Sequence, residues 1–195
     1  MDAAAQYALA YALTTTAGIR AIMPLAAVAI AAHLGILHPP AAFAWLGHAS
    51  VMWALCAIAG VELLADKVPL LDHGLHFLQI ALKPAAAAII VGGAVHPQNH
   101  DTLVLLMVAG ALNALGVHSA VAATRAVSTV GTAGIANPAL SAAEDAGSIV
   151  TLLVGFFAPF LAAALALLLT ILLVVLARRV YASLAGARRR ARRSV

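Results

Sequence analysis

The sequence predicts an all-α fold: a polytopic membrane helix bundle of about five transmembrane segments, with broken or kinked helices. Of the 195 residues, 64% are hydrophobic and only 9% are charged, and the mean hydropathy is +1.03. Water-soluble domains are nearer half apolar. Apolar runs of about 20 residues, the length that crosses a ~30 Å hydrocarbon core, recur along the chain. Residues 1–177 are therefore expected to form one transmembrane bundle without a separate soluble domain.

Each expected helix corresponds to one apolar segment, and the segments lie at about 4–33, 48–65, 70–95, 103–124 and 147–177. The last of these carries no charge. At a rise of ~1.5 Å per residue it is longer than the hydrocarbon core. We therefore expect it to tilt, to kink at Pro159, or to project from the membrane.

The first segment contains a predicted break. Gly18, Arg20 and Pro24 combine a flexible residue, a charge and a missing N–H within one span. Pro24 cannot donate a hydrogen bond to the Arg20 carbonyl, so the helix should kink or unwind there. Unwound backbone at membrane depth lines cavities or solute sites in many transporters. The alternative is a proline-kinked helix whose Arg20 side chain reaches the membrane interface.

Most of the positive charge follows the last apolar segment. The net charge is +4, and seven of the eleven basic residues lie in 178–195. Such a cluster is typical of a cytoplasmic tail on anionic lipid, and we expect no nucleic-acid binding. If all five segments cross, the N-terminus is outside. The connections 33–47 and 96–101 are then on the cytoplasmic side, and 66–69 and 125–146 are outside.

Ionisable residues inside the apolar segments are the candidate site. A charge at membrane depth costs a few kcal/mol or more, so it normally faces a partner or a wet cavity. The candidates for a substrate or ion site are Arg20, Glu62, Asp66, Asp72, His76, Lys83, His118, Arg125, Glu144 and Asp145.

Two acidic residues close the second segment. Glu62 and Asp66 are four residues apart and share one helical face. Such a pair binds a hard cation, shares a proton, or is neutralised by a basic neighbour. The alternative is an interfacial helix end, with Lys67 as counter-ion and Pro69 opening the next helix.

The third segment carries one polar seam. Asp72, His76, Gln79 and Lys83 recur at helical spacing on an otherwise apolar helix, and in a membrane this face should point into the bundle. Pro84 predicts a second kink. The His73-x-x-His76 spacing is weak evidence for a metal, and histidines without a metal are about three times more probable.

The fourth segment and its exit hold the remaining candidates. His118 and Arg125 are seven residues apart, on one face. Ser141 and Glu144 fit a helix-capping box, which is the structural alternative for Glu144. Asp145 has no such role, and we expect it to pair with Arg125 or Arg20. A charge-assisted contact between one of these two carboxylates and one of these two arginines is predicted.

These motifs together resemble the bacterial membrane family called domain of unknown function 4126. The resemblance covers nearly the whole chain, and its most specific parts are the strings Glu62-x-x-Ala65-Asp66-Lys67-x-Pro69 and Asn137-Pro138-x-x-Ser141-x-x-Glu144-Asp145. One departure is Lys83-Pro84, where the family pattern has Arg-Pro; the charge is kept but bidentate pairing is lost. The resemblance implies a small multi-span inner-membrane protein and no established activity.

Because the resemblance implies no activity, the function has to be inferred from the residue types and their spacing. No zinc-protease helix, serine nucleophile elbow or phosphate-binding glycine loop is present in the sequence, so we do not expect an enzyme. We expect a transporter-like protein for a cation or small solute. The alternatives are a transporter or flippase for an anion such as a lipid phosphate, and a membrane assembly protein that does not transport. Membrane lipids, an ion or small molecule, and a second copy of the chain are the partners considered; the sequence identifies no cofactor or metal.

Overall fold

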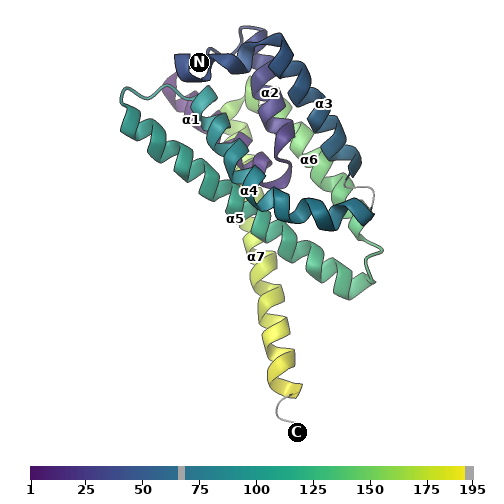
Figure 1. The fold of residues 1–195 in the computed structure, drawn as a ribbon. Coiled ribbons are helices and arrows are strands. Elements are labelled where there is room, and N and C mark those ends of the chain that lie inside the picture. Colours follow the sequence, from purple (N-terminus) through teal and green to yellow (C-terminus); the bar gives the residue numbers. More distant parts are fainter. Residues whose placement is uncertain (66–68, 192–195) are drawn as a thin grey trace.

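The structure is a computed structural model that describes the backbone of residues 1–65 and 69–191. Side chains within these ranges are described except at 65, 69–77, 176–177 and 180–191. The described residues form seven α-helices, one 3-10 helix and no β-strand, which confirms the all-α prediction. The helices pack side by side as a bundle, and the two termini lie at opposite ends (Figure 1).

The helices differ in length and in their capacity to cross a membrane. Among the described residues, α5 and α6 are long and apolar enough, and η1 with most of α3 makes a third span if this pair, bent by 66°, is counted as one. Shorter apolar helices complete the bundle, and together they indicate a membrane protein. In chain order the elements are α1 (Ala3–Ile19), α2 (Ile22–His33), η1 (Ala41–Gly47), α3 (Ala49–Ala65), α4 (Pro69–Ala94), α5 (His100–Thr132), α6 (Asn137–Phe157) and α7 (Pro159–Ala191).

The first predicted segment is not one span, because the chain reverses between α1 and α2 (Figure 1). Near the start of α1, the Gln6 side chain accepts a hydrogen bond from the His96 N–H, just after α4. The element that follows α2 reaches the same place, since Phe43 of η1 lies against Gly92 near the end of α4. The start of α1 and the end of α2 therefore share one end of the bundle. The predicted single crossing is replaced by a hairpin.

The fifth predicted segment also reverses. Ala162 of α7 packs with Ala12 in the middle of α1, and Leu173 packs with Ile19 at the end of α1. Helix α7 therefore follows α1 in the same direction, whereas α6 runs the opposite way (Figure 1). In place of the expected kink at Pro159, the chain reverses direction between α6 and α7. Pro159 is the first residue of α7, where its missing N–H needs no partner.

These reversals correct the predicted topology. The connections around 34–48 and 95–99 lie at the end of the bundle that holds the N-terminus, not at the end that holds the C-terminus. The turn at 133–136 lies toward the end from which α7 projects, not opposite it (Figure 1). Each hairpin returns the chain to the end of the bundle from which it came, so the described connections between the two hairpins lie at the opposite end from the one predicted (Figure 1). The predicted tail begins inside α7, which stays helical to Ala191.

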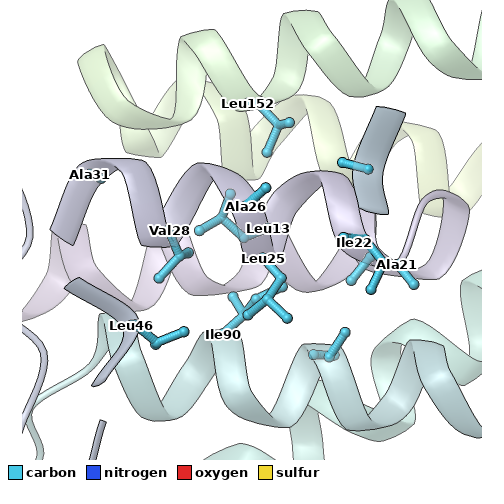
Figure 2. Close-up of a cluster of buried hydrophobic side chains, with 14 of the residues drawn as sticks. Leu13, Ala21, Ile22, Leu25, Ala26, Val28, Ala31, Leu46, Ile90 and Leu152 are labelled. Atoms are coloured by element: carbon cyan, nitrogen blue, oxygen red, sulfur yellow. The ribbon is translucent and has the colours of Figure 1, made fainter. Parts of the chain in front are cut away.

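The largest cluster of buried apolar side chains surrounds the α1–α2 hairpin (Figure 2). Leu13 of α1, Leu25 and Val28 of α2, and Ile90 of α4 are all buried there. Between membrane helices the hydrophobic effect contributes little, and close packing supplies the attraction. The hairpin is therefore held on several sides by fitted side chains.

Close packing is tightest where α1 meets α5, and this allows a stability test. A Cβ at Gly18 would lie 2.6 Å from the Ala114 carbonyl oxygen and 2.6 Å from Val117 Cβ, atoms that move only with the helix. We expect Gly18→Ala to destabilise the protein by about 1–3 kcal/mol, measured as a lower melting temperature in detergent. Gly60→Ala is the matched control, because no atom lies within 4 Å of its added Cβ. It should stabilise by about 0.5–1 kcal/mol. Equal melting temperatures for the two variants would contradict the close approach.

Candidate functional site

The turn between α1 and α2 forms the tip of a hairpin at the middle of the bundle. Helix α1 ends at Ile19, and Arg20 adopts an extended conformation with φ −125° and ψ 115°. Ile19 packs with Val117, halfway along α5, so the tip does not reach the far end of that helix. Pro24 lies in the first turn of α2, where it needs no hydrogen-bond partner. The predicted break is confirmed.

Glu62 of α3 caps the new helix. Its Oε1 accepts the Ala21 N–H at 2.7 Å, and its Oε2 accepts the Ile22 N–H at 3.0 Å. The first N–H groups of a helix have no partner within the helix and attract negative charge. A carboxylate from a neighbouring helix therefore satisfies both donors. Glu62 therefore stabilises the hairpin by capping α2, a role that the sequence did not predict.

Arg20 is the most buried charge that the structure describes, with 2% of its surface exposed. One terminal nitrogen lies 2.6 Å from Asp145 Oδ1 and donates to Ser141 Oγ at 3.1 Å. Ser141 and Asp145 are four residues apart and so share one face of α6. The predicted contact between the hairpin arginine and Asp145 is confirmed. It joins the tip of the hairpin to α6.

Arg125 of α5 pairs with Glu144 of α6 through two nitrogens. Its Nε donates to Glu144 Oε1 at 3.3 Å, and a terminal nitrogen donates to Oε2. The pair is partly exposed, at 26% and 16%. The capping-box interpretation is wrong, because α6 begins at Asn137 and Ser141 already lies in its second turn. Both side chains bind arginines instead.

Lys83 of α4 and His118 of α5 form the fourth contact. Lys83 is 3% exposed and His118 is 6% exposed, and Nζ lies 2.9 Å from Nδ1. When Lys83 is an ammonium it can only donate, and His118 Nδ1 is then the acceptor. Helix α4 continues through Pro84 as a single element.

Lys83 differs from the two arginines in what balances its charge. Within the described part of the chain, the hydrogen-bond partner of Lys83 is the His118 imidazole, whereas the arginines each contact a carboxylate. Glu62 and Glu144 act on Lys83 only through space, against Arg20 and Arg125. The described charges of the candidate site sum to zero. The three cations are Arg20, Lys83 and Arg125, and the three carboxylates are Glu62, Glu144 and Asp145. Among the described residues, the compensation of the Lys83 charge is nevertheless indirect.

Three candidates cannot be placed. Asp66 and the side chains of Asp72 and His76 lie outside the described residues. Of the seam on α4, Lys83 is buried and Gln79 is half-buried, which agrees with an inward face for this half of the seam. Among the described residues no cluster of three histidine, cysteine or acidic side chains could hold a metal ion.

Several polar contacts were not predicted. Ser141 binds Arg20, and Asn113 of α5 donates to both Thr14 and Thr15 of α1 at 3.0 Å. A signal for the second contact exists in the sequence, because Asn113 is a single amide within an apolar run. The sequence gives no local signal for the contact of Ser141 with Arg20, because a serine at this position also fits a helix-capping pattern.

Fold and site together define a helical membrane protein with a hairpin that turns inside the bundle and a buried network of charges. The chain belongs to the family described as Domain of unknown function (DUF4126), whose model matches residues 7–179. No curated protein and no solved structure matches the chain.

Proposed function

We propose that this protein transports a small anionic solute across the membrane and that Lys83 binds the anion. The observation that carries the proposal is a buried lysine that, among the described residues, is hydrogen-bonded to an imidazole nitrogen and not to a carboxylate. Removing a charge from water costs several kcal/mol unless an opposite charge compensates it. A bound anion at Lys83 Nζ supplies that compensation through a charge-assisted hydrogen bond.

The surrounding architecture supports transport. A hairpin that turns at the middle of the bundle places a helix end at membrane depth, as the broken helices of secondary transporters do. Ionisable residues at that depth commonly mark a solute or proton path. We place the protein in the inner membrane with its arginine-rich C-terminal end in the cytoplasm, by the positive-inside rule.

The described carboxylates give less support to a cation as the substrate. Glu62 accepts two backbone N–H groups, Asp145 contacts Arg20, and Glu144 contacts Arg125. A cation site would depend on Asp66 and Asp72, whose side chains lie outside the described residues. A purely structural role would favour a carboxylate beside every buried cation, and no described carboxylate contacts Lys83.

The test measures flux in proteoliposomes. Purified protein is reconstituted, and uptake of labelled inorganic phosphate, chloride and acetate is recorded. We expect one of these anions to be taken up, and Lys83→Met to reduce its uptake about tenfold or more, the equivalent of one lost charge-assisted hydrogen bond. Lys83→Arg keeps the charge and should retain most of the flux. Arg178→Gln, which removes an exposed positive charge on α7, is the matched control and should leave it unchanged.

Three results separate the alternatives. Anion flux that survives Lys83→Met in a folded variant would overturn the role of Lys83. Translocation of a fluorescent phospholipid, with none of the three small anions moved, would identify a lipid phosphate as the substrate. Sodium or potassium flux that is insensitive to Lys83→Met would restore the cation proposal. Size-exclusion profiles and melting temperatures of every variant establish that lost flux is not lost fold.

A further inference from the structure

A second candidate site lies apart from the charges. A cavity of about 240 Å³ lies between α1, α4 and α5, and its lining residues carry no charge. Its polar lining includes Tyr7, Tyr11, Thr14 and Asn113, and the rest is apolar. An engineered apolar cavity of about 150 Å³ is already large enough to bind benzene. This cavity therefore has room for part of an uncharged amphiphilic molecule.

The orientation of the Asn113 amide follows from its hydrogen bonds. Thr14 Oγ1 donates to the Tyr11 carbonyl at 3.0 Å, so its single proton is used. The Asn113 atom 3.0 Å from Thr14 Oγ1 must then be the donor, Nδ2, whose other proton faces Thr15 Oγ1. Both amide protons are engaged on α1. The carbonyl oxygen Oδ1 accepts no hydrogen bond from the described residues, which leaves it as the free acceptor of the amide. Asn113 lines this cavity and also a second one, between α5 and α7.

The cavity opens on the outer surface of the bundle. Ala109, at its edge, is exposed on α5. Its neighbours on the same helix, Leu105, Val108 and Leu112, are 68%, 51% and 63% exposed. In a membrane protein such an apolar outer face contacts lipid chains. A molecule would therefore enter this cavity from the bilayer.

We propose that the cavity binds an uncharged membrane lipid that carries a hydroxyl group. The hydroxyl donates to Asn113 Oδ1, and the apolar body lies between α1 and α5. A charged head group would be left without a counter-charge, because the lining carries none. A pure hydrocarbon would leave the fixed amide oxygen without a donor. The site is independent of Lys83, and its failure or success has no bearing on anion transport.

The test uses a matched pair of photoreactive lipids. The full-length protein in phosphatidylcholine vesicles is irradiated with a dodecanol that carries a diazirine in its chain, or with the methyl ether of the same compound, which cannot donate. Labelled peptides are then mapped by mass spectrometry. We expect the alcohol to label α1 around Tyr7–Thr14 and α5 around 106–113 about three- to tenfold more than the ether, as one hydrogen bond in an apolar site implies.

Variants then separate recognition from folding. Asn113→Leu should lower labelling by the alcohol to the level of the ether. Because this change also removes two bonds to α1, Ala109→Phe serves as a second variant that blocks the opening and leaves the amide intact; it should exclude both probes. Asn113 also borders the second cavity, of about 250 Å³ between α5 and α7. Thr170→Val alters only that second cavity, and it should leave the labelling unchanged if the alcohol binds between α1 and α5. Equal labelling by alcohol and ether, or labelling around Thr170 in place of α1, would overturn the proposal.

Discussion

Replacing Arg20 with methionine should destabilise the protein by about 3–5 kcal/mol, because it breaks a buried ion pair. Arg20 is 2% exposed and its partner Asp145 is 15% exposed. Methionine fills similar space but leaves a carboxylate inside the bundle without its cation, which costs several kcal/mol. Thermal unfolding in detergent, together with the yield of monodisperse protein, measures the effect.

The control for this prediction is the second ion pair. Arg125→Met removes an arginine of the same size from a pair that is 26% and 16% exposed. Because water screens these charges in part, its effect should be clearly smaller. Adding Asp145→Asn to Arg20→Met should recover part of the stability, since the second change removes the orphaned charge. Similar melting temperatures for the two arginine variants would show that Arg20 does not anchor the hairpin.

Replacing Glu62 with alanine should destabilise the hairpin by about 2–6 kcal/mol, because two backbone donors at membrane depth lose their acceptors at once. Hydrogen–deuterium exchange of peptides that cover Ala21 and Ile22 should rise with the fall in melting temperature. Exchange elsewhere in the bundle should change less, which distinguishes loss of the cap from general unfolding.

Glu62→Gln is the matched variant for this second prediction. The amide keeps one acceptor oxygen but places an NH₂ group opposite the other backbone N–H, so an intermediate loss is expected. A melting temperature that is unchanged in both variants would contradict the capping role. If flux were lost while the fold was intact, Glu62 would instead carry a proton or a cation.

The class of the protein and part of the site are predictable from local properties of the chain. A high apolar content with charges inside apolar segments predicts a helical membrane bundle with a polar centre, and the structure agrees. Pro24 removes one backbone bond wherever the helix lies, so the break near Arg20 follows from the covalent chain. The contact of Arg20 with a carboxylate is predictable as well, because a buried guanidinium needs such a partner.

The direction of the chain after each break was decided by the tertiary structure. An apolar segment has the same hydropathy whether it forms one continuous helix or two helices that reverse direction. The segments 4–33 and 147–177 were therefore predicted as single spans, although each contains a reversal. The choice of partners followed from those reversals. Asp145 contacts Arg20, and Glu144 contacts Arg125. Glu62 binds the backbone at the start of α2. These residues lie close together because the two antiparallel hairpins bring their helices side by side. Composition determines that a buried charge needs a partner, whereas only the packing of helices in space decides which partner lies within hydrogen-bond distance.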